Sequence, residues 1–399
     1  MNQIDAFIVD AVRTPIGKYG GVLRDIRADD LGAIPIRAIL ERTNIPPEIV
    51  DDIIYGCANQ AGEDNRNVAR MSALLAGLPF SVPAVTINRL CGSSLDAINS
   101  AARAIWSGDA KVIIAGGVES MSRAPYSVPK NQKGTYGNVT AYDTALGWRY
   151  PNSKIEKIFP LESMGETAEN VAEKYSITRE EQDLFAYQSH LKAITAQEKN
   201  IFSQEITSIT TGSEKEKIVI EKDECPRKDT SLEKLSQLKP IFRKNGTVTA
   251  GNSSSLNDGA ASVLIMNEKK VSEFNLTPLA RIVSTGIAGV DPRYMGIGPV
   301  PASNSALKKA GLNIEKIDLV ELNEAFASQS LAVIHDLKIE KEKLNLNGGA
   351  IALGHPLGCS GARIMTTLIY EMQRKKLRFG LATMCIGVGQ GIATIIERI

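Results

Sequence analysis

Short apolar runs alternate with stretches of helical spacing over the first 118 residues of the chain. The apolar runs are rich in β-branched residues and predict buried strands. These strands span residues 6–12, 52–55, 85–87 and 111–115, and Gly116-Gly117 close the last one. Apolar residues three and four positions apart predict helices at 30–41, at 68–76 and from Leu95 onward. Strands that alternate with helices indicate an α/β fold with a parallel type of sheet, covered on both faces.

The pattern changes between residues 119 and 247, where apolar runs nearly vanish and charged helical sequence replaces them. Thr178, followed by Glu180 and Glu181, predicts a helix N-terminus, because threonine caps backbone N–H groups and acidic residues suit the first turn. The basic residues of this segment either form a solvated face or meet an anionic ligand. We expect residues 119–247 to form a mainly helical loop domain, inserted into the α/β body.

The pattern of the first part returns after this insertion. The corresponding segments are 280–285 with 6–12, 298–324 with the run that ends at 56, 345–353 with the strand and turn before Cys91, and 379–384 with 111–117. The repeat predicts an N-terminal half of residues 1–118 and 248–272 and a C-terminal half of residues 273–399. Each half is a βαβαβ unit, so each is expected to supply turns to one shared site at the carboxyl ends of its strands.

Composition and charge exclude several classes of partner. The chain has 399 residues, of which 43% are apolar and 23% charged, as in an ordinary globular protein. Its net charge of +1 gives no general attraction to nucleic acid, and no apolar run is long enough to span a membrane. There is no signal-peptide pattern, and the five cysteines are widely spaced without a CxxC pair. We expect a cytoplasmic protein with no disulfide framework and no metal site.

Cys91 lies in the sharp turn between a predicted strand and a predicted helix. Unpaired backbone N–H groups and the helix dipole at such a position favour a thiolate over a thiol. A cysteine of lowered pKa on this turn is an activated nucleophile. The alternative interpretation is a small, buried, apolar cysteine.

Three further motifs follow strands of the second half. They are the sequences NEAFA at 323–327, GHPLG at 354–358 and CIGVGQG at 385–391. His355 stands between Gly and Pro, whereas His190 and His335 lie in ordinary helical sequence and are expected to be structural or solvent-facing. The last motif lacks the spacing of a phosphate loop. A cysteine hydrolase needs one cysteine and one histidine, which leaves Cys385 unexplained.

These motifs, in this order and over the whole chain, resemble those of the thiolase family. The resemblance implies that Cys91 is the nucleophile that carries the acyl group, and that His355 activates it and helps to stabilise the oxyanion of the 3-keto group. It further implies that Asn323 holds a water at that oxyanion site. Cys385 would be the acid and base, for which a pKa near 8 is suitable. The backbone at Gly387 would form a second oxyanion hole with the Cys91 amide.

The resemblance also implies a layered αβαβα body and a loop domain that holds coenzyme A. Arg227 stands where the family contacts the adenine nucleotide, although it could be a mere surface charge, and Ser254 stands where the family contacts the pantetheine arm. Coenzyme A and acyl-CoA would be substrates, with no further cofactor. The family is usually a homodimer or homotetramer.

The family contains enzymes of different acyl specificity. Enzymes specific for acetoacetyl-CoA usually have a histidine before the methionine of the loop-domain motif, whereas this chain has Ser163 before Met164. The segments 56–71, 144–152 and 382–393 resemble 3-oxoadipyl-CoA thiolases, although Gly165 and Ser94-Leu95 depart from that subgroup. We expect Arg149 to bind the distal carboxylate of such a substrate. The alternatives are an acetoacetyl-CoA thiolase, a 3-ketoacyl synthase type of condensing enzyme and a non-catalytic relative.

Overall fold

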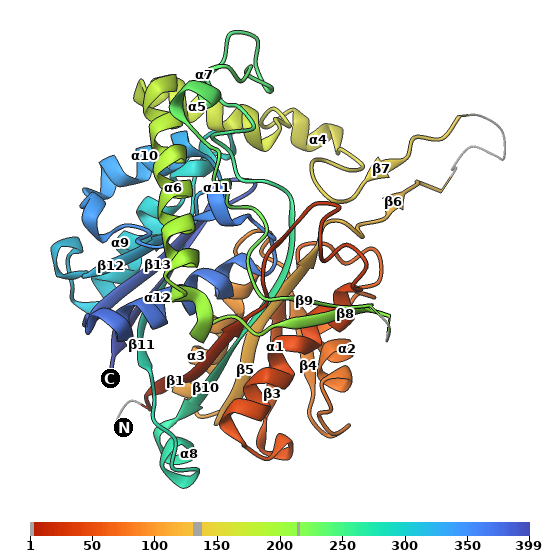
Figure 1. Cartoon of the computed structure of the whole chain (residues 1–399), viewed down its shortest axis with the longest axis vertical. Coiled ribbons are helices and arrows are strands. Elements are labelled where there is room, and N and C mark those ends of the chain that lie inside the picture. Colours follow the sequence, from red (N-terminus) through yellow and green to blue (C-terminus); the bar gives the residue numbers. More distant parts are fainter. Residues whose placement is uncertain (1–3, 131–137, 214–215) are drawn as a thin grey trace.

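One large mixed sheet forms the centre of the computed structural model, which describes residues 4–130, 138–213 and 216–399 (Figure 1). The strands run in the order β12-β13-β14-β11-β1-β10-β5-β3-β4, with β2 paired to β10. Their bounds are β1 Ala6–Arg13, β2 Gly17–Lys18, β3 Asp52–Gly56, β4 Ala84–Ile87, β5 Val112–Ser120, β10 Asn257–Asn267, β11 Ala280–Gly289, β12 Leu319–Leu322, β13 Phe379–Ile386 and β14 Gln390–Arg398.

The sheet is mixed, so the prediction of a parallel type of sheet was only partly right. Strand β3 is parallel to β4 and β5, and β12 is parallel to β13. The other pairs in the sheet are antiparallel, because β10 enters between β1 and β5, and β14 enters between β11 and β13. These two strands come late in each half of the sequence, and nothing in the local pattern shows where they insert.

Helices cover both faces of the sheet. The helices of the body are α1 Ala28–Thr43, α2 Val68–Leu75, α3 Ser93–Ser107, α8 Glu268–Glu273, α9 Pro299–Ala310, α10 Ala327–Leu337, α11 Ala350–Leu353 and α12 Ser360–Lys375. Along β5, Ile113 and Ala115 face the core of α3 and α12, whereas Val112 and Ile114 face the core of α1 and α2. This alternation is the period of two of a β-strand, and it explains why a strand buried on both faces is apolar throughout.

Helices α3 and α12 form an inner layer that is shared by both halves. Residues of both helices pack in one core with residues from strands of the first and second halves. The outer helices form separate cores, one with α1 and α2 and one with α9 and α10. The two halves of the sheet meet where β1 pairs with β11, and only at Phe7–Arg281 and Ile8–Ala280. The predicted layered α/β body is therefore confirmed, with one continuous sheet linking its halves.

The repeat predicted from the sequence is present in the elements. The run α9, a 3₁₀ turn at Ile314–Lys316 and β12 repeats α1, a 3₁₀ turn at Pro47–Ile49 and β3. One predicted match was wrong, because residues 345–353 contain the short helix α11 instead of a strand. A single bridge between Val320 and Leu344 takes the place of the fourth strand.

The sequence predicted that strand β5 ends at Gly116-Gly117, but the strand continues to Ser120. A β-carbon at Gly117 would lie 2.1 Å from the carbonyl oxygen of Gly358. The glycine therefore allows the loop before α12 to lie directly on the strand. The pair Gly116-Gly117 is therefore explained by this close approach of the loop, and not by a turn at the end of the strand.

The segment between β5 and β10 contains helices and two small hairpins. The helices are α4 Ser153–Glu156, α5 Met164–Tyr175, α6 Arg179–Glu198 and α7 Leu232–Ser236. The hairpins pair β6 Tyr126–Ser127 with β7 Tyr142–Asp143, and β8 Ile209–Ser213 with β9 Glu216–Ile220; the first extends away from the body (Figure 1). Thr178 caps α6 as predicted, in a reciprocal pair with Glu181. In the described part of the chain, no helix is long and apolar enough to cross a membrane.

The contact between α3 and α12 gives a prediction on stability. A β-carbon at Gly361 would lie 2.3 Å from the backbone nitrogen of Leu95. We expect Gly361→Ala to lower the free energy of unfolding by about 1–3 kcal/mol, because neither backbone can move aside. Gly289→Ala is the matched control, since the nearest atom there is 3.9 Å away. Urea denaturation of both variants measures the difference, and equal stabilities would contradict this account of the contact.

Candidate active site

Turns after β4 and β12 carry Cys91 and Asn323, the end of β13 carries Cys385, and the loop before α12 carries His355. Cys91 directly precedes Gly92, the N-cap of α3, as the sequence predicted. The turns come from both halves of the chain, and the inner helices α3 and α12 begin beside them. The site is therefore a product of the repeat.

The Cys91 turn is held by short hydrogen bonds. Leu90 has a φ of 47°, in the left-handed region that leucine rarely adopts. Its N–H donates to Oδ1 of Asn88 at 2.8 Å, and its carbonyl accepts from Oγ of Ser93 at 2.6 Å. Oγ of Ser93 also accepts the N–H of Arg89 at 2.9 Å. A strained backbone conformation that several hydrogen bonds hold in place is typical of ligand-binding and catalytic sites.

Burial raises the pKa of the Cys91 thiol to about 11. The backbone N–H groups of Gly387 and of Cys91 itself favour the thiolate, and the charge of Glu119 opposes it. The prediction that the helix N-terminus lowers this pKa was therefore wrong for the free enzyme. The two N–H groups do converge on the sulfur, so the anticipated proximity of Gly387 and Cys91 is present.

Cys385 is buried near the end of β13, beside an apolar cluster that includes Phe326, Ala168 and Val248. Burial raises the pKa of its thiol strongly, and the charge of Cys91 raises it further. The expected pKa near 8 is thus contradicted, since Cys385 is held as the protonated acid. The Cys91 turn also lies against the end of β13, since a β-carbon at Gly92 would lie 2.5 Å from Cδ1 of Ile386.

His355 is buried and neutral. Its Nδ1 lies 2.6 Å from Oγ of Ser360, whose hydroxyl can donate to the carbonyl of Pro356 at 2.9 Å. If the hydroxyl proton makes that bond, Nδ1 carries the imidazole proton and Nε2 is an acceptor, with Nδ2 of Asn323 3.4 Å away. Burial lowers the pKa of His355 to about 3, and the positive charge of Arg363 lowers it as well. The backbone N–H of His355 donates to Oδ1 of Asn257 at 2.8 Å.

Asn323 lies against the imidazole. Its Nδ2 is 3.4 Å from Nε2 and 3.5 Å from Nδ1 of His355. Its Oδ1 is buried and has no hydrogen-bond partner among the described residues. Within the same part of the chain, no hydrogen bond joins the sulfur of Cys91 to His355. The structure thus brings Asn323 to His355, and Cys91 to Gly387 and Cys385.

Of the two residues expected to contact coenzyme A, Ser254 contacts one of these turns, whereas Arg227 contacts helix α6. The N–H of Ser254 donates to the carbonyl of Ala325 at 2.9 Å, within the NEAFA motif. The N–H of Arg227 donates to Nδ1 of His190 at 3.2 Å, and its guanidinium has no ion-pair partner in the described residues. His190 is buried, with its pKa lowered to about 4 by burial and by Arg227, so it is structural and not solvent-facing.

Arg149 belongs to a contact between two of the segments that resemble 3-oxoadipyl-CoA thiolases. Its Nη1 donates to the carbonyl of Thr144 at 3.4 Å, and Nδ2 of Asn59 donates to Oγ1 of Thr144 at 3.1 Å. Burial raises the pKa of Asp64, and the charge of Arg149 opposes this shift. Arg149 is thus half-buried near a buried carboxylate.

Sequence reasoning missed Asn257 and Ser360, which hold His355. Ser360 lies within the GHPLGCSGAR motif, so its position was visible, but its role was not. Asn257 is 98 residues away from His355 in the sequence, and no local pattern could connect them.

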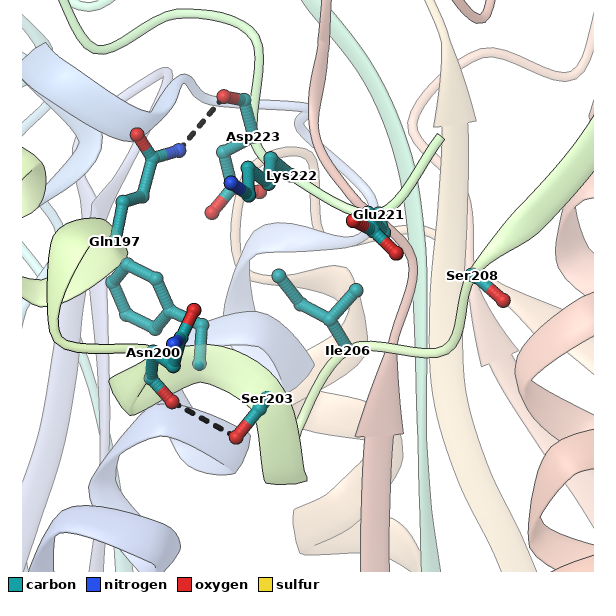
Figure 2. A pocket seen from close by; sticks show the side chains of 9 residues that line it. Gln197, Asn200, Ser203, Ile206, Ser208, Glu221, Lys222 and Asp223 are labelled. Carbon is teal, nitrogen blue, oxygen red and sulfur yellow. Dashed lines mark hydrogen bonds between the residues drawn. The ribbon is translucent and has the colours of Figure 1, made fainter. Parts of the chain in front are cut away.

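A cavity of about 340 Å³ contains none of the predicted site residues. It lies by the end of α6 and the 3₁₀ helix Ile201–Gln204, where the amide of Gln197 donates to the carbonyl of Asp223 (Figure 2). The candidate site therefore rests on the convergence of the motif residues and not on cavity size.

Comparison with known proteins agrees over the whole chain. The thiolase N-terminal domain matches residues 6–269, and the thiolase C-terminal domain matches residues 276–398. A beta-ketoadipyl-CoA thiolase of Acinetobacter baylyi is 54% identical, covering 99% of this chain and 99% of that protein. The 3-oxoadipyl-CoA/3-oxo-5,6-dehydrosuberyl-CoA thiolase of Escherichia coli K12 is 53% identical, covering 99% of this chain and 100% of that protein.

Solved structures give the same result. Human mitochondrial 3-ketoacyl-CoA thiolase superimposes with a TM-score of 0.94 at 44% identity, over 99% of both chains. The Bacillus anthracis acetyl-CoA acetyltransferase gives a TM-score of 0.93 at 44% identity, over 100% of this chain and 99% of that one. The fold and the relatives define an acyltransferase. The chain belongs to the thiolase family.

The neutral, buried His355 gives a prediction on pH and stability. Its pKa is about 3 when folded and about 6.5 when unfolded, so below pH 6.5 the unfolded chain binds a proton that the folded chain does not. His355 therefore lowers stability as the pH falls from 6.5 toward 3, by about 1.4 kcal/mol per pH unit. We expect His355→Gln to lose less stability than the wild type between pH 7 and pH 5. Urea denaturation at both pH values measures this.

The matched control is His335→Gln, at an exposed position. It should follow the wild-type pH dependence. A slope for His355→Gln equal to that of the wild type would show that His355 is protonated in the folded protein.

Proposed function

We propose that this thiolase cleaves 3-oxoadipyl-CoA with coenzyme A, giving acetyl-CoA and an acyl-CoA shortened by two carbons. The observation that carries the proposal is the full-length identity of 53–54% to enzymes named for this substrate. The absence of the histidine before Met164 supports it against a dedicated acetoacetyl-CoA enzyme. The same chemistry runs in reverse as a Claisen condensation.

The first step forms an acyl-cysteine. The sulfur of Cys91 attacks the C3 carbonyl, and its proton passes to Nε2 of His355, because the imidazole is neutral and carries its own proton on Nδ1. The bond between C2 and C3 then breaks, and the electron pair leaves as the enolate of acetyl-CoA. The protonated thiol of Cys385 delivers its proton to that carbon, which suits the raised pKa of Cys385.

The second step releases the acyl group. The thiolate of Cys385 takes the proton of an incoming coenzyme A thiol, and the coenzyme A sulfur attacks the acyl-Cys91 carbonyl. The bond between that carbon and the Cys91 sulfur breaks. Both cysteines return to their starting protonation states once the imidazolium of His355 gives its proton back to Cys91.

Two oxyanion sites support these steps. The backbone N–H groups of Gly387 and Cys91 converge on the Cys91 sulfur, so they are placed to bind the oxygen of the acyl-cysteine intermediate. At the other site, the unpaired buried Oδ1 of Asn323 supports a water that donates to it and to the 3-keto oxygen, next to His355.

Coenzyme A is a substrate in this proposal, and no further cofactor is needed. The unpaired guanidinium of Arg227 supports binding of the nucleotide phosphates, since guanidinium groups bind phosphate through two N–H donors. Ser254 lies beside Ala325, close to Asn323, which supports a contact to the pantetheine arm as it enters the site.

The proposal includes a homodimer or homotetramer in the cytoplasm. Strand β4 lies at the edge of the sheet, and Val85 on it is 42% exposed, which supports pairing with a second copy. All five cysteines are free thiols, which agrees with a reducing compartment. Sedimentation equilibrium measures the oligomeric state.

The distal carboxylate of the substrate is assigned to Arg149, beside Asp64. We expect Arg149→Ala to lower kcat/KM for 3-oxoadipyl-CoA by about 10-fold to 100-fold, the cost of one lost charged hydrogen bond. Turnover of acetoacetyl-CoA, which has no distal carboxylate, should change little. The assay follows loss of the absorbance of the magnesium enolate of each 3-oxoacyl-CoA in the presence of free coenzyme A.

Lys154→Ala is the matched control, because Lys154 is an exposed cation in the next helix. Equal losses on both substrates in Arg149→Ala would refute the role of Arg149. A wild-type preference for acetoacetyl-CoA or a medium-length straight chain would refute 3-oxoadipyl-CoA as the substrate. Failure to trap an acyl group on Cys91 by mass spectrometry would refute the mechanism.

A further inference from the structure

A buried carboxylate near the end of β5 lies beside the site and has no part in the chemistry above. Glu119 is 2% exposed, and its two oxygens accept three backbone N–H groups. Oε2 accepts from Ala58 at 2.9 Å and from Gly358 at 2.8 Å, and Oε1 accepts from Asn59 at 3.1 Å. Among the described residues, no lysine, arginine or histidine forms an ion pair with it.

These bonds join two loops that are far apart in the sequence. Ala58 and Asn59 follow β3 in the first half, and Gly358 belongs to the His355 loop in the second half. The Sγ of Cys57 also points to Oε1 of Glu119, at 3.8 Å. One side chain thus fixes the His355 loop against the first half of the protein.

Side chains from three different elements accept backbone N–H groups along the His355 loop. The N–H of Ile351 donates to Oε2 of Glu324 at 3.3 Å, and the N–H of His355 donates to Oδ1 of Asn257 at 2.8 Å. The third such bond is the one from Gly358 to Glu119. Glu119 is the acceptor that comes from β5, the strand on which the loop rests at Gly117. On the C-terminal side of the loop, Ser360 bonds to His355 and to the carbonyl of Pro356 from within the same segment, so Glu119 is the acceptor that joins this side to β5.

The strand that carries Glu119 also lies against the start of α3, since a β-carbon at Gly117 would lie 2.8 Å from Cβ of Ser94, three residues after Cys91. The titratable groups that face Glu119 are Cys57, Asp64, Cys91 and Cys359, all of which are neutral or negative. Burial raises the pKa of Glu119 to about 7, against the three N–H donors, so it is ionised above neutral pH. In that state it disfavours a second negative charge on Cys91.

We propose that Glu119 is a positioning residue for the thiolase reaction, which fixes the His355 loop relative to the Cys91 turn and holds a buried negative charge near that turn. The inference rests on the proposed roles of Cys91 and His355. It gives one buried carboxylate two roles: it positions the base His355, and it holds a negative charge near the nucleophile Cys91.

The variant Glu119→Gln has the same size but only one acceptor oxygen. Its amide N–H groups would face backbone N–H groups on the other side, so the loop shifts. We expect kcat to fall by about 10-fold to 100-fold, as for sub-ångström to ångström misplacement of a reacting group, with KM for coenzyme A little changed. Loss of the negative charge should also move the pH midpoint of Cys91 alkylation by iodoacetamide to lower pH, measured on the Cys91 peptide by mass spectrometry.

The variant Glu119→Asp retains the charge but shortens the reach. It should lower kcat while leaving the alkylation midpoint near that of the wild type, and Glu41→Gln, an exposed position on α1, should change neither. An unchanged kcat in Glu119→Gln would overturn the proposal. A lowered kcat with an unmoved alkylation midpoint would also overturn it, because a purely structural role predicts that result.

The alkylation readout keeps this test separate from the proposed function. Alkylation of Cys91 is measured on the free enzyme without turnover, so the result does not depend on which acyl-CoA is the substrate. Should Glu119→Gln not fold, the kcat of Glu119→Asp decides, and wild-type kcat in that variant would overturn the proposal. Absence of an acyl-enzyme in the wild type would instead count against the proposed function.

Discussion

The active site depends on the close contact between the N-terminal ends of α3 and α12. The backbone at Gly361 lies so near Leu95 that no β-carbon fits between them, and Oγ of Ser94 accepts the N–H of Ala362 at 2.9 Å. Each helix begins directly after a loop of the site, so the contact that joins the two halves also sets the distance between the loops. The sheet alone could not do this, because β1 and β11 pair at only two positions.

Burial decides the protonation state of the reacting groups. The N-terminus of α3 contributes about 0.3–1 kcal/mol in favour of a thiolate, less than the free energy of one pKa unit, about 1.4 kcal/mol. Removal from water acts in the opposite direction and outweighs it, so the thiols of Cys91 and Cys385 and the imidazole of His355 are all uncharged in the free enzyme. In the proposed mechanism, proton transfer therefore accompanies attack on the substrate and does not precede it.

Local patterns predicted the strands and helices well, but not how they meet. Residues 6–12 and 379–384 were recognised from their apolar runs, and the cap at Thr178 from its motif. Strand direction was missed because β10 and β14 enter the sheet from distant parts of the sequence. Residues 345–353 were misread as a strand because an apolar run of that length fits either structure. The motifs selected the candidate site residues by resemblance, whereas the protonation of those residues depends on burial that no sequence pattern shows.

Carboxylates are buried near the site because the His355 loop needs acceptors for its backbone N–H groups. A loop inside a protein cannot satisfy its backbone N–H groups by secondary structure, so side-chain acceptors must do so. A carboxylate without a cation is a costly choice, unless several N–H groups share its charge. Glu119 and Glu324 each accept donors from different segments and thereby tie the His355 loop to the rest of the body. The carboxylates that accept the backbone N–H groups of this loop thus also determine its position. The need to pair buried N–H groups and the placement of His355 are therefore met by the same side chains.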